Sequence, residues 1–228
     1  MGSKNRIAKY VLPIMLKKRI NRVWVEPFVG GGNIIDKVDG ERIGADINSY
    51  LIDALISIRD NVNDLPRNNQ EFTESDYKEL RRSNDYKHKG YAGFAFSYAG
   101  KWLGGWCRDS EGRRDYVSES YSNAIKQSPK LQGIKFVNAS YLDLEIPRNS
   151  LIYCDPPYEG ATKYKDDFNH PAFWEWCRDK AKEGHIVFVS EYTAPDDFEC
   201  VWQKEITSSL TKNTGSKKAI EKLFIYNT

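Results

Sequence analysis

Residues 23–33 have the sequence VWVEPFVGGGN, in which a short apolar run is followed by three consecutive glycines. The run from Val23 to Phe28 is rich in residues that favour β-strands. The glycines at 30–32 permit a tight turn and let a ligand approach the backbone closely. Such a turn at the end of a first strand is typical of nucleotide-binding α/β folds, although taken alone it can equally be a structural loop.

Helical and strand patterns alternate on both sides of this turn. Apolar residues recur with helical spacing over 5–20, over 169–183, and over 48–59, where Asn48 fits an N-cap. Strands are predicted over 23–28, 42–46, 135–138, 151–154 and 185–190, with a hairpin formed by 200–206 and 222–226. This alternation predicts an α/β protein with a Rossmann-like, doubly wound, mostly parallel sheet and an antiparallel C-terminal hairpin strand.

The segment 62–133 interrupts the alternation, because it is polar, basic and aromatic and is punctuated by glycines. We interpret it as a small, mainly helical insertion for target recognition, between the two parts of a catalytic domain at 1–61 and 134–228. Its aromatic residues are expected to pack a small core. Four of its basic residues are candidates for DNA binding, with ordinary solvated side chains as the alternative: Lys101, Arg108, Arg113 and Arg114.

Composition excludes several classes of protein. The 228 residues are 40% hydrophobic and 13% aromatic, which excludes a disordered chain, and no apolar run approaches the length of a membrane span. The N-terminal residues do not resemble a secretion signal, and the four scattered cysteines suggest neither a zinc site nor a disulfide framework. We therefore expect a cytoplasmic protein with reduced, mostly buried thiols and no metal. The oligomeric state is left open.

Charge is distributed unevenly along the chain. Residues 1–22 carry a net charge of +7 and residues 76–135 a net charge of +5, whereas residues 143–200 carry −7. This pattern suits a protein that holds a polyanion on one face and keeps acidic pockets for a cationic cofactor. Ordinary surface variation is the alternative.

Two carboxylates suggest which ligand the glycine turn receives. Asp46 ends the second predicted strand, where a carboxylate can accept hydrogen bonds from ribose hydroxyls, or can simply cap a helix. Glu26 places a negative charge beside the turn, and this suits the sulfonium and amino group of S-adenosylmethionine better than a pyrophosphate. The glycines also lack the Gly-x-Gly-x-x-Gly spacing of dinucleotide sites.

The most informative motif is Asp155-Pro156-Pro157-Tyr158, which directly follows the apolar strand 151–154. The prolines hold the backbone rigid with their carbonyls free to accept hydrogen bonds, and Asp155 adds another acceptor. Together these acceptors can grip an NH₂ group as it attacks a methyl sulfonium. Tyr158 offers a ring on which a flipped base can stack. A merely rigid turn is the alternative.

The order of the motifs resembles that of the DNA adenine methylase (Dam) family, the D12-class N6-adenine DNA methyltransferases of the α-type motif order. The chain has Phe28-Val29-Gly30-Gly31-Gly32 first, then an insertion, and then Asp155-Pro156-Pro157-Tyr158. Gly2-Ser3-Lys4 is similar to the family's N-terminal Gly-Gly-Lys, and residues 213–218 and 221–226 are similar to its closing loop and last strand. The resemblance implies a cofactor site for S-adenosylmethionine made by Lys4, Glu26, Phe28, Gly30, Gly32, Asp46, Asp143 and Asp155.

The resemblance implies site-specific methyl transfer to the N6 amine of an adenine flipped out of double-stranded DNA, as in restriction–modification. Asp155, Pro156, Pro157 and Tyr158 would be the catalytic residues. Two alternatives stay open: a methyltransferase acting on another amine, in cytosine N4, RNA or protein, and a non-catalytic DNA-binding scaffold. Product analysis distinguishes the first alternative, and cofactor binding the second.

Overall fold

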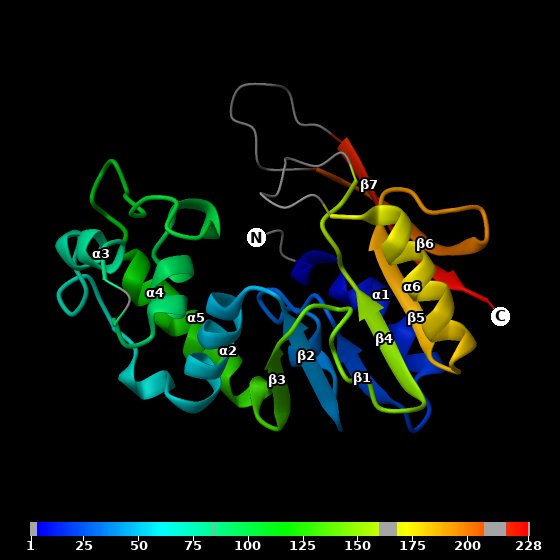
Figure 1. Ribbon diagram of the computed structural model, residues 1–228. Helices are drawn as coiled ribbons and strands as arrows, with labels where there is room; N and C mark the ends of the chain where they lie inside the picture. Colours follow the sequence, from blue (N-terminus) through cyan, green and yellow to red (C-terminus); the bar gives the residue numbers. More distant parts are fainter. Residues whose placement is uncertain (1–3, 84, 160–167, 208–217, 228) are drawn as a thin grey trace.

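The computed structural model describes residues 4–83, 85–159, 168–207 and 218–227. These residues build a seven-stranded sheet of order β3-β2-β1-β4-β5-β7-β6 (Figure 1). The strands are β1 (Val23–Glu26), β2 (Arg42–Asp46), β3 (Ile134–Asn138), β4 (Ser150–Cys154), β5 (Ile186–Glu191), β6 (Phe198–Thr207) and β7 (Lys218–Tyr226). Neighbouring strands from β1 to β5 pair in parallel, whereas β7 pairs antiparallel with both β5 and β6. The Rossmann-like fold predicted from the sequence is therefore confirmed.

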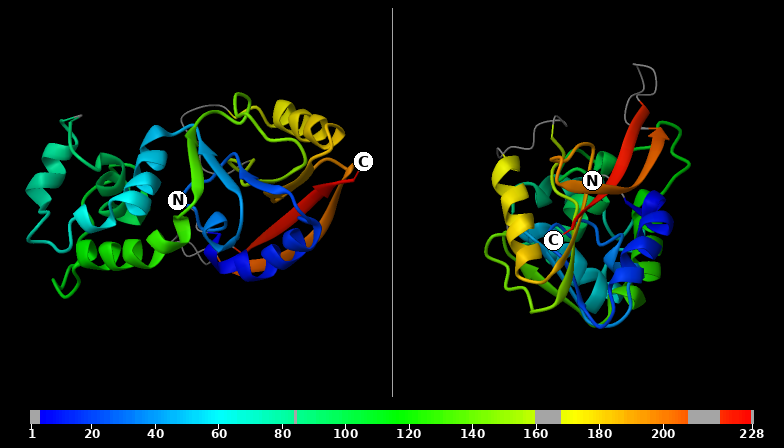
Figure 2. Two further views of the ribbon diagram at one scale, coloured as in Figure 1. Left: turned by 90° about the horizontal axis from the view of Figure 1, so that it is seen from below. Right: turned by 90° about the vertical axis from the view of Figure 1, so that its right-hand side faces the viewer.

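Helices cover both faces of the sheet. They are α1 (Asn5–Lys18), α2 (Ser49–Asp60), α3 (Glu74–Leu80), α4 (Lys89–Ala95), α5 (Tyr116–Leu131) and α6 (His170–Lys182), with short 3₁₀ turns η1 (Ile35–Lys37), η2 (Val62–Asp64) and η3 (Tyr98–Gly100). Buried side chains of α6 form one core with one face of the sheet, and those of α1, α2 and α5 form a second core with the other. Figure 2 shows α1 and α6 on opposite sides of the sheet.

The local signals that define these elements agree with the sequence analysis. Asn48 caps α2, where its side chain accepts a hydrogen bond from the Tyr50 amide at 3.0 Å. The strand predicted over 42–46 is observed with the same bounds. The expectation of mostly buried thiols holds for Cys154 and Cys177, which are buried, and only in part for Cys107, which is half-buried. It is wrong for Cys200, which is exposed because it lies on the edge strand β6.

The segment 62–133 is mainly helical, as predicted, and α3 and α4 lie beyond the β3 edge of the sheet (Figure 1). Its aromatic residues pack inside: Phe72, Tyr77 and Phe96 are almost fully buried. The helix α4 lies against α2 at Gly90, where an added Cβ would approach the Tyr50 carbonyl oxygen to 2.2 Å. The buried residues of the segment belong to the same core as α2, so the insertion continues the main core.

The sheet order places a switch point between β1 and β4. The chain runs from β1 outward through β2 to β3 and then returns to β4 on the other side of β1. In open α/β sheets the ligand crevice lies outside the carboxyl ends of the strands at such a point. The glycine turn after β1 and the Asp-Pro-Pro-Tyr motif after β4 both lie at this edge.

Candidate active site

The turn after β1 is tight because two of its glycines adopt left-handed backbone conformations. Gly30 has φ +50° and Gly32 has φ +68°, values that side-chain-bearing residues rarely adopt. Nothing lies within 4 Å of a Cβ built on Gly30, so this position faces open space. The structure therefore leaves room for a ligand to approach the backbone at Gly30.

Asp46 ties this turn to the start of α2. Its Oδ2 accepts a hydrogen bond from the Gly30 amide at 3.1 Å, and its Oδ1 accepts one from the Asn48 amide at 2.9 Å. Burial raises the pKa of Asp46, and the two amide hydrogen bonds partly oppose that rise. The carboxylate thus lies directly beside the glycine turn, at the place predicted for a ribose contact.

Glu26 is buried beneath the turn, with 3% of its surface exposed, where the sequence suggested a charge at the mouth of the site. Its Oε1 accepts a hydrogen bond from Trp24 Nε1 at 2.8 Å. Burial raises its pKa well above the ordinary value, and the neighbouring Asp155 raises it further. The position differs from our expectation because Glu26 is the last residue of β1 and is enclosed by the strands on either side of it.

Asp155 lies at the carboxyl end of β4 and pairs with Lys4, which in turn pairs with Glu221 near the other end of the chain. Lys4 Nζ is 3.2 Å from Asp155 Oδ1, 3.1 Å from Glu221 Oε2 and 2.6 Å from the Tyr158 hydroxyl oxygen. The Tyr158 hydroxyl donates to Glu221 Oε2 at 2.8 Å. We call Lys4, Asp155, Tyr158 and Glu221 the acidic cluster. Three of its members were predicted as site residues from the sequence, and Glu221 was not.

The electrostatics of the acidic cluster depend on Lys4. Burial raises the pKa of Asp155, and the Lys4 ammonium opposes this rise. Burial lowers the pKa of Lys4, but Asp155 and Glu221 together more than compensate, so its pKa is raised and it stays cationic. One ammonium therefore lies between two carboxyl groups. The cluster can therefore accept a further positive charge nearby.

The other predicted cofactor and motif residues are arranged around this edge. Phe28 packs against Tyr141, with ring centroids 5.3 Å apart. Pro156 is buried and Pro157 is half-buried. Asp143 is exposed in the turn after β3, the strand beside Asp46, and its amide donates to the Ser140 carbonyl at 3.1 Å.

Glu191 was also missed by the sequence analysis. It ends β5, is 1% exposed, and accepts hydrogen bonds from the Tyr192 amide at 2.7 Å and the Glu159 amide at 3.1 Å. Burial raises its pKa to about 7. The signal available in the sequence is the one that identified Asp155, a carboxylate at the carboxyl end of an apolar strand, but the strand was predicted to stop at Ser190.

The predicted DNA-binding residues are all exposed on the insertion, separate from the acidic cluster. Arg108 pairs with Glu74, Arg113 with Glu111 at 2.9 Å, and Arg114 with Glu119 at 2.5 Å. Since exposed pairs of this kind are worth little, the arginines are accessible to a stronger anion. Lys101 is exposed in the loop that follows η3.

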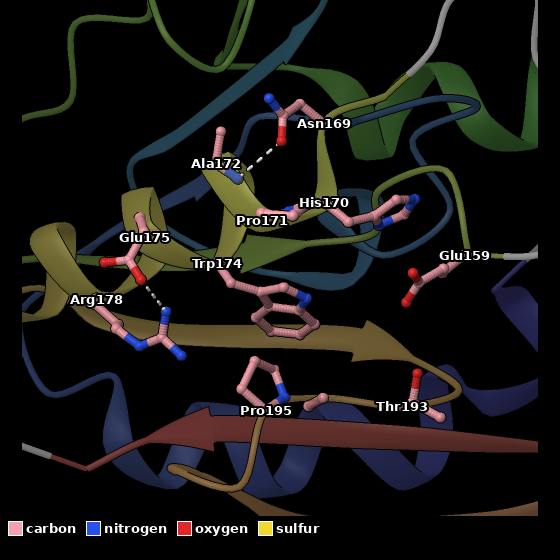
Figure 3. A pocket seen from close by; sticks show the side chains of 11 residues that line it. Glu159, Asn169, His170, Pro171, Ala172, Trp174, Glu175, Arg178, Thr193 and Pro195 are labelled. Atoms are coloured by element: carbon pink, nitrogen blue, oxygen red, sulfur yellow. Dashed lines mark hydrogen bonds and ion pairs between the residues drawn. The ribbon is translucent and has the colours of Figure 1, made fainter.

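A pocket of about 640 Å³ lies beside the acidic cluster, between the start of α6 and the segment after β5 (Figure 3). It is lined by Glu159, His170, Trp174, Arg178, Thr193 and Pro195, among others. Glu159 and Thr193 follow Tyr158 and Tyr192, whose rings pack edge to face with centroids 4.6 Å apart. None of the residues predicted for the site lines this pocket.

Two kinds of feature are absent from the described residues. No group of three or more His, Cys, Asp or Glu side chains in the described ranges is arranged to hold a metal ion. Across the same ranges, no helix is both long and apolar enough to cross a membrane. The predicted resemblances at Gly2-Ser3 and at residues 213–217 lie outside the described residues.

Comparison with known proteins identifies the N-terminal part of the chain. Residues 1–95 match the model of the D12 class N6 adenine-specific DNA methyltransferase family. The match includes Lys4, the glycine turn and Asp46, and it confirms the family resemblance over these residues. It supports S-adenosylmethionine as the methyl donor. No curated protein matches the chain.

Several solved structures show a distant similarity. The tRNA (m1A58) methyltransferase TrmI from Aquifex aeolicus is 9% identical with a TM-score of 0.44, over 100% of this chain and 71% of that one. The candidate methylase HI0767 from Haemophilus influenzae is 10% identical with a TM-score of 0.41, over the full length of both chains. SMU.472, a candidate methyltransferase solved with SAH, is 10% identical with a TM-score of 0.38, over 98% of this chain and 52% of that one.

Proposed function

We propose that this chain, whose residues 1–95 match the D12 class of adenine-specific DNA methyltransferases, transfers a methyl group to the N6 amine of an adenine flipped out of duplex DNA. The single observation that carries the proposal is the position of Asp155. Its carboxylate follows β4, beside the glycine turn of β1, at the switch point of the sheet. A hydrogen-bond acceptor for the target amine thus lies next to the place predicted for the methyl donor.

The cofactor fits the residues around the glycine turn. Asp46 is placed to accept hydrogen bonds from ribose hydroxyls, and Gly30 leaves open space in front of the backbone. Ile47 is 76% exposed directly after Asp46, and Leu142 is 64% exposed in the turn that precedes Asp143. Large apolar side chains exposed on neighbouring strand ends can cover an adenine ring, while Asp143 accepts a hydrogen bond from its amino group.

The acidic surroundings suit a cationic methyl donor. Glu26, Asp155, Glu191 and Glu221 gather at the carboxyl ends of β1, β4 and β5 and near the start of β7, with Lys4 as the cation among them. A positive sulfonium is attracted to this edge, and after transfer the neutral thioether product has lost that attraction. When bound, S-adenosylmethionine supplies the methyl group.

Asp155 and the backbone of Pro156 hold the amine during transfer. Their oxygens accept its two hydrogens, which directs the nitrogen lone pair away from them and toward the methyl carbon. The nitrogen would then attack the methyl group of the bound cofactor, whose sulfur would take the electron pair of the broken carbon–sulfur bond. The methylated amine then releases one proton. Asp155 can take it, because burial raises its pKa and makes it a better base than an exposed aspartate.

We assign target recognition to residues 62–133 and catalysis to residues 1–61 and 134–228. The exposed Lys101, Arg108, Arg113 and Arg114 are available for phosphates and for guanine edges. Tyr158, with its hydroxyl held by Lys4 and Glu221, is the residue on which the flipped base stacks. By the family resemblance, we infer that this activity takes place in the cytoplasm of a bacterial or phage-infected cell.

The test is methyl transfer from labelled S-adenosylmethionine to methylation-free duplex DNA, followed by digestion to nucleosides and mass analysis. N6-methyladenine that depends on the wild-type protein and is lost in Asp155→Ala is the expected product. N4-methylcytosine, or transfer only to RNA or protein, would replace the proposal with another amine substrate. The absence of cofactor binding would leave a non-catalytic scaffold.

A further inference from the structure

Glu221 is an unexpected member of the acidic cluster, because it comes from a strand that runs opposite to its neighbour β5. Lys222 pairs with Glu191, the last residue of β5, so Glu221 lies one residue beyond that end of β5. The beginning of an antiparallel strand thus lies at the carboxyl edge of the parallel strands. Only 6% of Glu221 is exposed.

The contacts of Glu221 join two residues of the site. Its Oε2 accepts from Lys4 Nζ at 3.1 Å and from the Tyr158 hydroxyl at 2.8 Å. Lys4 Nζ also lies 2.6 Å from the Tyr158 oxygen and 3.2 Å from Asp155 Oδ1. An ammonium has three N–H donors, and these three partners can use them all. The Lys4 charge is therefore divided between two carboxylates.

The division of this charge matters for Asp155. If Glu221 lost its charge, the ammonium would be held by Asp155 alone and would neutralise the acceptor that the target amine needs. The Tyr158 hydroxyl would at the same time lose its charged acceptor, so the orientation of its ring would be less defined. Both effects act on the transferring amine rather than on the cofactor residues near Asp46.

We propose that Glu221 is a positioning residue for methyl transfer: it holds the Lys4 ammonium partly away from Asp155 and fixes the orientation of Tyr158. The proposal rests on the proposed function, since it assigns Asp155 and Tyr158 to the target base. Glu221 acts through these residues and does not itself touch the reacting atoms.

The charged groups that act on Asp155 come from several elements. Lys4 precedes α1 and lowers the pKa of Asp155, whereas Glu221 on β7 raises it. Glu26 on β1 and Glu191 on β5 each have their own pKa raised by Asp155, so both lie within electrostatic range of it. Tyr158, in the same motif, also lowers the pKa of Asp155. Removing the charge of Glu221 should therefore lower the pKa of Asp155.

The experiment compares Glu221→Gln with the wild type. Glutamine keeps the size and one acceptor oxygen but removes the charge. We expect kcat to fall about tenfold or more, as for a lost hydrogen bond to a charged group, with the KM for S-adenosylmethionine within about threefold of the wild type. The acidic limb of the kcat–pH profile should move to lower pH. A residue that only supported the fold would leave that limb in place.

A double-mutant cycle with Tyr158→Phe tests the contact directly. Because phenylalanine removes the hydroxyl that Glu221 accepts, Tyr158→Phe should cost much less in the Glu221→Gln background than in the wild type. Glu199→Gln is the matched control, an exposed carboxylate on the adjacent strand β6, and it should leave kcat unchanged. Additive losses in kcat, together with an unmoved pH profile, would overturn the positioning role.

The same cycle is repeated on the free energy of unfolding, which needs no substrate. If the wild type binds S-adenosylmethionine but methylates no DNA, the proposed function fails, and the assignment of Glu221 to that reaction fails with it. Coupling in unfolding would then still establish the Glu221–Tyr158 contact. If the wild type is active and the cycle shows coupling in both kcat and unfolding, the positioning role is supported.

Discussion

Replacing Asp155 by asparagine should abolish methyl transfer without lowering the stability of the fold, because the ionised Asp155 carboxylate is itself unfavourable in the folded protein. Its pKa is raised by burial, so keeping it ionised in the folded protein is unfavourable at any pH above that pKa. Asparagine has the same shape, cannot ionise, and keeps one oxygen that can accept from Lys4. The variant should therefore fold at least as well as the wild type near pH 8 while losing methyl transfer.

The magnitudes follow from the contacts. The ion pair with Lys4 spans 3.2 Å and is mostly buried, with 14% of Lys4 and 23% of Asp155 exposed; Lys4 keeps Glu221 and the asparagine oxygen as partners, so loss of the pair costs about 1 to 3 kcal/mol. Relief of the desolvation cost acts in the opposite direction, which leaves the free energy of unfolding within about 1 kcal/mol of the wild type. The loss of a preorganised charged acceptor at the reacting nitrogen should lower kcat by about 10² to 10³.

Three measurements on the same preparation test this separation. Single-turnover transfer to unmethylated duplex DNA gives the rate, calorimetry gives the affinity for S-adenosylmethionine, and urea titration gives the free energy of unfolding. The control is Asp179→Asn on the exposed surface of α6, where the carboxylate pairs only with Lys182 at 3.2 Å among the contacts of the described residues. An Asp155→Asn variant that transfers methyl groups at the wild-type rate, or that loses several kcal/mol of stability, would refute this reasoning.

Three other perturbations probe the cofactor turn, the buried acid of β5 and the core of the insertion. In Asp46→Asn a single oxygen remains for the Gly30 and Asn48 amides. Calorimetry should therefore show that the affinity for S-adenosylmethionine is reduced about tenfold or more, whereas an unchanged Kd would remove Asp46 from the cofactor site. The pKa of Glu191 is raised from 4.5 to about 7, so its ionisation lowers the free energy of unfolding progressively as pH rises between these values, by about 3 kcal/mol in total. Glu191→Gln should remove that decline from urea titrations between pH 4 and 8. Parallel stability–pH curves for the two proteins would contradict the assignment. Phe72 is fully buried in the core that the insertion shares with α2. Phe72→Ala should therefore lower the free energy of unfolding by about 3 to 5 kcal/mol in a single transition. A separate unfolding transition for the insertion would contradict the shared core.

Much of the fold followed from local patterns. The alternation of apolar strands and amphipathic helices predicted the order of elements, and Asn48 marked the start of α2 correctly. Boundaries were less certain where charged residues belong to a strand. Glu191 and Glu221 lie within β5 and β7, but apolar periodicity gives no signal for a carboxylate at a strand end, and the strands that it predicted stopped at Ser190 and began at Lys222. Only the family resemblance, over 221–226, included Glu221.

The burial of a side chain and the partners that it contacts could not be predicted from these local patterns. Glu26 was expected as a charge at the mouth of the site, and it is buried against Trp24. The arginines of the insertion were candidates for DNA, and Arg108 pairs with Glu74, which is 34 residues away in the sequence and comes close only when the insertion folds. Burial and pairing arise from packing between distant segments, which no local pattern records.

The sequence alone determined that Asp46 and Asp155 lie on one edge of the molecule. The carboxyl ends of parallel strands share an edge, so a residue that follows a recognisable strand is placed by the local pattern. The resemblance already implied that Lys4 lies near Asp155, but the contact between Lys4 and Glu221, 217 residues apart, became visible only in the folded chain. That contact requires the antiparallel insertion of β7 beside β5 and the packing of α1 on the sheet, and both depend on burying apolar surface across the whole chain.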